Sequence, residues 1–170
     1  MDQRHENLLR LDEQLFSKRG GLLSFWQDVA ENFYVERADF TSQRSLGRDF
    51  AAELDTSYPI LVRRDLGDAF GAMLRPRGAQ WFHIRPAQEE LETQEARVWL
   101  ERVERAMRRA MYARRTQFTR ATKEADHDFA AFGNAILTVE LNSEGSDLLY
   151  RCWHLRDVAW TEDADGRLAC

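Results

Sequence analysis

Four histidines and two cysteines are the side chains of this sequence best suited to metal binding or nucleophilic chemistry. The histidines are His5, His83, His127 and His154, and none lies three or four residues from another, as two ligands on one helix face would. Asp126-His127-Asp128 puts three possible ligands in a row. Neighbours on a helix point about 100° apart, so these side chains cannot meet at one ion, and no metal site is predicted.

The other reactive residues favour structural roles. His83 and His154 fall in segments with strand-like alternation, and we expect each to be a hydrogen-bonded structural histidine. Cys152 lies between Arg151 and Trp153 and is predicted to be a buried, inert thiol. Two cysteines, Cys152 and Cys170, are too few for a disulfide framework, which indicates a reducing, intracellular compartment. The sequence contains no nucleophile elbow, phosphate-binding loop or dinucleotide fingerprint, so neither an enzyme nor a cofactor is predicted.

Arginine dominates the cations of the chain. Of 24 basic residues, 22 are arginine, and only Lys18 and Lys123 are lysine. We interpret this excess mainly as the codon bias of a GC-rich genome. Interfaces are a second contribution, because the guanidinium fork binds carboxylates and phosphates.

Positive charge is concentrated in one segment. Residues 92–123 contain nine basic and four acidic residues, whereas residues 124–170 contain three basic and ten acidic residues. Such a stripe could bind nucleic acid, pair with an acidic patch of a neighbouring subunit, or form a solvated helix face. The residues that we assign to contact with a neighbouring subunit or with DNA are Arg102, Arg105, Arg108, Arg109, Arg114 and Arg115.

Helical periodicity organises the first three quarters of the chain. With 170 residues, 44% of them apolar, the chain is sized for one domain, or one domain with an arm, and no run of 18 apolar residues could cross a membrane. The spacing of apolar residues predicts helices over residues 5–18, 24–33, 58–74 and 88–120, with helical character continuing over 123–132. The first two are expected to form an antiparallel hairpin over Arg19-Gly20-Gly21, with a glycine as left-handed cap.

Two spacings within these helices predict contacts. Gly67 and Gly71 lie four residues apart, which indicates close packing against another element. The pairs Glu101–Arg105 and Glu104–Arg108 have the spacing of ion pairs on one helix face.

Strand signals gather towards the end of the chain. Residues 80–85 are predicted to form a short strand, and residues 135–141 to pair antiparallel with 148–155. A further strand begins at 158–161, before the hairpin turn Asp163-Ala164-Asp165-Gly166. Since only four residues follow Gly166, we expect the sheet to be incomplete and the chain to be a fragment of a longer protein.

The predicted fold class is α+β, a mainly helical N-terminal region with a long helix followed by a small antiparallel sheet. The expected division is 1–56, a helical hairpin and an irregular segment; 57–134, helix, strand and long helix; and 135–170, antiparallel strands. Core packing is predicted for aromatic residues on apolar faces, with subunit interfaces as the alternative. These residues are Trp26, Phe33, Phe70, Trp81, Phe82 and Trp99.

The order of these features resembles the head-to-tail connecting (portal) proteins of short-tailed, T7-like bacteriophages. The stretches that carry the resemblance are residues 24–40, 71–86, 95–118, 128–140 and 158–168. Val35-Glu36-Arg37 stands where the family has a proline, and Met73-Leu74-Arg75-Pro76 followed by Trp81-Phe82 fills the place of a helix end before an aromatic strand. No single motif is diagnostic, since the signal lies in the combined order.

The resemblance implies a structural role, and it implies that the chain is the N-terminal part of a portal protein. Portal subunits form a ring, usually a dodecamer, at one capsid vertex, through which double-stranded DNA enters and leaves without sequence-specific binding. The implied partners are other copies of the chain, the major capsid protein, a tail adaptor and the terminase, and the implied location is the virion, with assembly in the host cytoplasm.

Two hypotheses follow for the arginine-rich segment. In a ring, the basic segment of one subunit could meet the acidic segment of the next, because ring contacts join different surfaces of each subunit. The alternative function is an independent DNA-binding or regulatory helical module that uses the arginine-rich helix.

Overall fold

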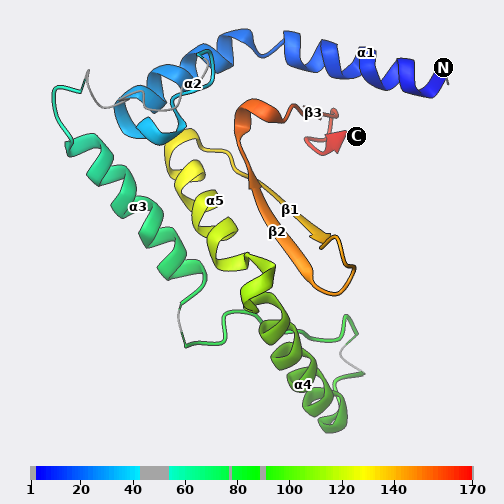
Figure 1. Ribbon diagram of the computed structural model, residues 1–170. Helices are drawn as coiled ribbons and strands as arrows, with labels where there is room; N and C mark the ends of the chain where they lie inside the picture. The colour runs from blue at the N-terminus through cyan, green and yellow to red at the C-terminus, as the bar shows by residue number, and fades with distance from the viewer. Residues whose placement is uncertain (1–2, 43–53, 77, 89–90, 170) are drawn as a thin grey trace.

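The computed structural model describes residues 3–42, 54–76, 78–88 and 91–169. Within them the chain is mostly helical and ends in antiparallel strands, which confirms the predicted α+β class. Figure 1 shows α3 (Tyr58–Leu74) and α5 (Phe118–Phe132) side by side at the centre, with a β-hairpin along α5. The three-part division of the chain stays a prediction, and most of its irregular segment lies outside the described residues.

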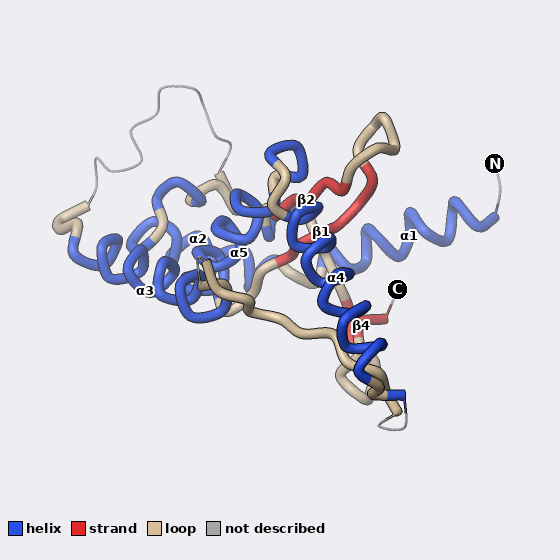
Figure 2. Tube along the Cα trace, turned by 90° about the horizontal axis from the view of Figure 1, so that it is seen from below, coloured by secondary structure: helices blue, strands red, loops and turns tan. Residues whose placement is uncertain are grey.

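The first two helices do not fold back on each other. α1 (Gln3–Ser17) and α2 (Gly20–Phe33) follow one another in the same general direction, and α1 extends away from the rest of the molecule (Figures 1 and 2). Gly20 and Gly21 form the first turn of α2 rather than a left-handed cap. The predicted antiparallel hairpin is therefore wrong.

A buried arginine explains this course of the chain. The guanidinium of Arg19, between α1 and α2, donates hydrogen bonds to the carbonyl oxygens of Leu155 at 3.0 Å and Arg156 at 2.8 Å. It also bonds the carbonyl of Val158. The start of α2 is thus held by the short 3₁₀ helix η4 (Leu155–Asp157) instead of by α1.

The predicted long helix is interrupted. α4 (Gln94–Met111) is capped by Tyr112, and η3 (Arg114–Thr116) and a left-handed Gln117, with φ of 58°, separate it from α5. The buried Thr116 hydroxyl donates to the carbonyls of Met111 and Ala113, so carbonyls at the end of α4 bond a side chain instead of continuing the helix. The break lets α4 project from the body, as Figure 2 shows from below.

The β-hairpin agrees with the sequence. β1 (Ile136–Leu141) pairs antiparallel with β2 (Leu148–Trp153), with Ile136 opposite Trp153 and Leu141 opposite Leu148. β3 (Thr161–Glu162) pairs with β4 (Leu168–Ala169) around the predicted turn, where Gly166 has φ of 74°. Residues 158–160 are not a strand, and β3 and β4 form a separate two-stranded sheet.

Residues 80–85 are extended but form no strand, which corrects the prediction. A strand needs a neighbouring backbone, and here the backbone N–H of Ile84 donates to the side chain of Glu104 on α4 instead. The ion pair predicted between Glu104 and Arg108 is absent among the described contacts for the same reason, because Glu104 is buried against this segment. The pair predicted between Glu101 and Arg105 is not formed in the described part either.

Two small cores hold the body together. One surrounds Trp26, which is 1% exposed, and contains Ala30, Ala38, Phe40, Phe132 and Leu155. The other joins Phe118 and Ala121 of α5 to Tyr150 of β2. Core packing is confirmed for Trp26, but Phe33 is exposed and Trp99 on α4 is 62% exposed, so their predicted burial is wrong.

Close packing at the two glycines of α3 is confirmed. A Cβ built on Gly67 would lie 2.4 Å from His127 Nδ1, and one on Gly71 would lie 3.1 Å from Asp126 Oδ2. The absence of a side chain on this face of α3 therefore allows α5 to approach.

Gly67→Ala is expected to destabilise the chain by about 1–3 kcal/mol, because the added methyl group overlaps the buried His127 ring. Gly21→Ala is the matched control. It has nothing within 4 Å of the new Cβ, so alanine should be neutral or stabilising by up to about 1 kcal/mol. Urea denaturation of both variants measures the difference, and equal midpoints would contradict the packing argument.

Candidate functional site

Three consecutive residues of α5, 126–128, point to different parts of the molecule. Both carboxylate oxygens of Asp128 accept hydrogen bonds from Arg37 of η1 (Val35–Arg37), each at 3.0 Å. Asp126 pairs with Arg75 at the end of α3. The divergence predicted from helix geometry is confirmed, and each side chain takes part in joining elements rather than converging on one ligand.

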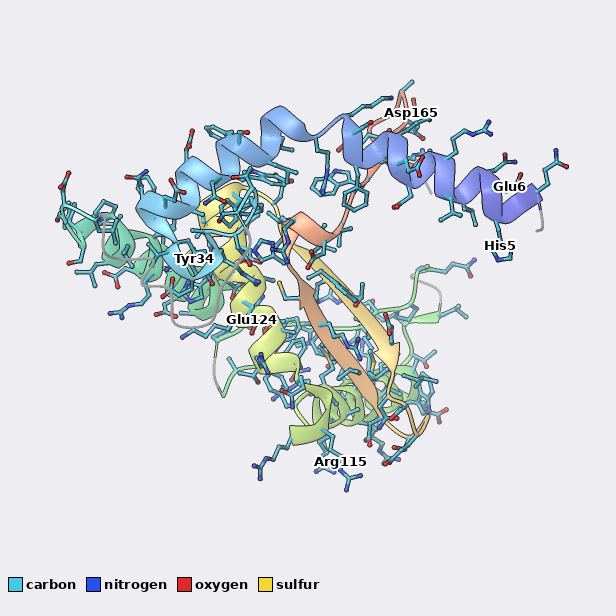
Figure 3. All side chains as sticks on the ribbon, turned by 45° about the horizontal axis from the view of Figure 1, so that its top comes forward. His5, Glu6, Tyr34, Arg115, Glu124 and Asp165 are labelled. Carbon is cyan, nitrogen blue, oxygen red and sulfur yellow. The ribbon has the colours of Figure 1, made fainter. Side chains whose placement is uncertain are left out.

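His127, the middle residue of the three, bonds a buried arginine. Arg63 of α3 is 6% exposed, and its Nη1 donates to His127 Nδ1 at 2.9 Å. The same guanidinium donates from Nε to the carbonyl of Phe33 at 3.2 Å and lies over the ring of Tyr34, 3.7 Å from its centroid. Tyr34, labelled at the end of α2 in Figure 3, stacks on Phe132 of α5 with ring centroids 6.2 Å apart. Arg63 therefore joins α2, α3 and α5 at one point.

These contacts determine the ionisation of His127. With Nδ1 accepting from Arg63, the ring carries its proton on Nε2, which lies 3.4 Å from Asp68 Oδ1. Burial lowers the pKa of His127, and the positive charge of Arg63 lowers it further, against a smaller opposite effect of Asp68. The folded state therefore favours the neutral ring.

The structural role predicted for His154 is confirmed. Its Nδ1 accepts the backbone N–H of Arg156 at 3.0 Å, and its Nε2 lies 2.8 Å from Asp39 Oδ1. Burial lowers the pKa of His154 below its ordinary value. His83 is exposed, although its Nδ1 lies within 3.3 Å of Gln80 Nε2.

Cys152 of β2 is half-buried, and its thiol donates to Asp128 Oδ2 at 3.5 Å. Burial raises the pKa of this thiol to about 12, with the carboxylate of Asp128 adding to the shift. The thiol therefore stays protonated at neutral pH, which confirms the prediction of an inert cysteine. Within the described ranges, no three His, Cys, Asp or Glu side chains are placed to hold a metal ion.

A basic groove lies between three helices of the body. It has a volume of about 1020 Å³ and runs between α3, the C-terminal half of α4 and the N-terminal half of α5. Gly67, Gly71 and Ala72 leave its α3 wall without large side chains. The cations that line it come from α4, from α5 and from the C-cap of α3, and are Arg105, Arg108, Arg109, Lys123 and Arg75.

The structure divides the six arginines selected from the sequence into two sets. Arg105, Arg108 and Arg109 line the groove. Arg102, Arg114 and Arg115 lie outside it and are exposed, and Figure 3 shows Arg115 pointing away from the body. Arg115 has a distant carboxylate, Asp147, at 3.9 Å.

A second set of arginines was not predicted from the sequence. Arg63 and Arg75 are the two ends of a stripe on α3 with four-residue spacing, in which Gly67 and Gly71 lie between them. Residues four apart share one face of a helix, and here that face meets Asp126 and His127. This spacing is the signal that could have found the contact, because two glycines flanked by two cations leave room for side chains that accept hydrogen bonds.

Comparisons with known proteins identify one family. Residues 5–169 match the family model described as bacteriophage head to tail connecting protein. None of the curated proteins matches the chain. Across the described ranges, every helix is too short or too polar to cross a membrane.

The pairing of His127 predicts a pH-dependent stability. Unfolded histidine titrates near pH 6.5, whereas folded His127 has a lowered pKa, so the unfolded chain binds more protons between the two values. The free energy of unfolding is therefore expected to fall as the pH drops from about 7.5 towards 5. His127→Asn, whose Oδ1 can accept from Arg63, should reduce this slope in urea denaturation across the range. His5→Gln on exposed α1 should keep the wild-type slope, and equal slopes for all three proteins would contradict the prediction.

Proposed function

Because the chain belongs to the bacteriophage head-to-tail connecting protein family, which matches it over residues 5–169, we propose that it is a subunit of the portal ring at a capsid vertex. The family is structural, and the chain is a phage virion protein rather than an enzyme. The family supports contacts with the capsid and the tail. We extend these to the major capsid protein, a tail adaptor and the terminase as specific partners, and to double-stranded DNA that passes through the ring.

The surface of the chain is the observation that carries the ring proposal. A compact monomer of 19.9 kDa would expose about 8,700 Å², whereas this chain exposes 12867 Å². The excess of about 4,000 Å² is of the size that large, permanent subunit interfaces bury. A chain of this shape therefore gains stability when other protein surfaces cover it, and in the ring proposal other copies of the chain supply such surfaces.

The excess surface includes large apolar side chains. They are exposed on α1, on the outer side of α3, on α4 and on β1, and examples are Leu8, Leu61, Trp99 and Val139. A ring places two different faces of each subunit against its neighbours, so exposed apolar residues on several sides are expected. An independent DNA-binding module has no comparable need for them.

The ring proposal predicts a discrete assembly. Static light scattering after size-exclusion chromatography should find one large species, and a ring of twelve would have about twelve times the 19.9 kDa subunit mass. A monomer or dimer whose binding to DNA weakens steeply with salt would favour the alternative, an independent DNA-binding module.

Trp99→Ala tests whether exposed aromatic residues contact other copies. Since Trp99 is exposed in the chain, its removal should change the free energy of unfolding by no more than about 0.5 kcal/mol. Loss of an interface tryptophan should raise the midpoint concentration of assembly by at least about fivefold.

Trp26→Ala provides the contrast, because this ring is buried in the core and its removal should cost about 3–5 kcal/mol. Light scattering over a dilution series gives the assembly midpoint, and denaturation gives the stability. An unchanged midpoint for Trp99→Ala would remove α4 from the proposed interface.

A further inference from the structure

We propose that the basic groove between α3, α4 and α5 receives the acidic β3–β4 hairpin of a second copy of the chain. The inference rests on the proposed function in one respect, which is that the partner is another copy of the chain. It goes beyond the family match because it names the two surfaces that contact each other.

The groove has positive charge that its own residues leave unpaired. Two of its cations have carboxylate partners: Arg75 pairs with Asp126, and Lys123 Nζ lies 3.0 Å from Asp68 Oδ1. Arg105, Arg108 and Arg109 have no carboxylate within 4 Å among the residues that the structure describes. An acidic ligand would therefore gain three charge-assisted contacts without breaking an existing pair.

The shape and lining of the groove favour a protein loop over a DNA duplex. The hollow is concave and contains aromatic side chains, including Trp81 and Phe118, beside the arginines. Its α3 and α5 walls also carry Asp68 and Asp126, whose charges are paired with Lys123 and Arg75, so the cations without a described carboxylate partner lie on α4. A hairpin can present a few carboxylates to the arginines of α4 and keep its uncharged side against the aromatic rings.

The β3–β4 hairpin has the complementary charge in a fixed form. Glu162, Asp163 and Asp165 are all exposed. Oδ1 of Asp163 accepts the backbone N–H groups of Asp165 at 2.9 Å and Arg167 at 2.8 Å, which holds the turn. Glu162 and Asp165 are thus presented by an ordered turn, and binding would lose little conformational entropy.

The groove and the hairpin of one chain cannot meet. Figure 1 places the hairpin beyond the far end of β2 from the junction of α4 and α5, and Figure 3 shows Asp165 and Arg115 at opposite sides of the molecule. Complementary surfaces at separate places on one chain join copies head to tail, which is the contact type that builds rings.

The scarcity of lysine makes this contact directly measurable. Lys18 and Lys123 are the two lysines of the sequence, and Lys123 lines the groove. A carbodiimide joins lysine amines to carboxylates that touch them, without a spacer. In an equal mixture of ¹⁴N- and ¹⁵N-labelled chain, mass spectrometry should find mixed-label links between Lys123 and the tryptic peptide 157–167, which contains the hairpin carboxylates.

Charge-reversed variants test the specificity of the link. Arg105→Glu combined with Arg109→Glu should lower the yield of mixed-label links at least about tenfold. Arg102→Glu combined with Arg114→Glu makes the same change of charge on α4 and η3 outside the groove, and should keep the yield within about twofold.

The inference is overturned if the mixed-label link is absent, if Lys18 forms it as readily, or if both double variants lower it equally. It is also overturned if a short DNA duplex displaces the hairpin at equimolar concentration. Light scattering reports ring formation separately. Mixed-label links without a closed ring would support the hairpin contact and contradict the ring proposal. A closed ring without mixed-label links would support the ring proposal and contradict the hairpin contact.

Discussion

The fold depends on one buried cation and the space that receives it. Arg63 sits where α2, α3 and α5 meet, bonded to a backbone carbonyl, an imidazole nitrogen and the face of an aromatic ring. Removing one partner of such a buried group typically costs several kcal/mol, because the remaining polar atoms lose water without a replacement. The contact exists only because Gly67 leaves room for the imidazole next to it.

A chain with two small cores needs such polar joints. The apolar clusters around Trp26 and Phe118 are separate, and arginine contacts bridge the elements around them. Arg19 ties the start of α2 to η4, Arg37 ties η1 to α5, and Arg75 ties the end of α3 to α5. The arginine excess, interpreted from composition mainly as a genome effect, therefore also contributes to the internal architecture, since a guanidinium can bond several backbone and side-chain acceptors at once.

Local sequence patterns predicted much of the fold, whereas contacts between residues far apart in the sequence were missed. The boundaries of α3, the β1–β2 pairing and the final hairpin turn follow from periodicity and turn residues. The alternation of residues 80–85 predicts a strand, but alternation does not reveal whether a partner strand exists. In the structure the backbone N–H of Ile84 bonds to the carboxylate of Glu104 instead. The break after α4 depends on the hydroxyl of Thr116, which donates to the carbonyl of Met111 at the helix end. The spacing of apolar residues does not reveal such a bond. Of the predicted site, the concentration of positive charge in residues 92–123 indicated six arginines, but only the packing of α3, α4 and α5 shows that three of them line a groove.

The segment of residues 80–84 before α4 attaches that helix to the rest of the chain at two places, near its middle and at its C-terminal end. Residues 80–84 are bonded to Glu104 near the middle of α4, and Trp81 Nε1 donates to Tyr112 at its end at 3.1 Å. One covalent path from α4 leads back through this segment to α3, and the other leads forward through η3 to α5. A force on the projecting helix would therefore load both central helices together, and the Arg63 and Arg75 contacts resist their separation. Tension applied to α4 would in this way reach the centre of the chain as a shear along α3 and α5.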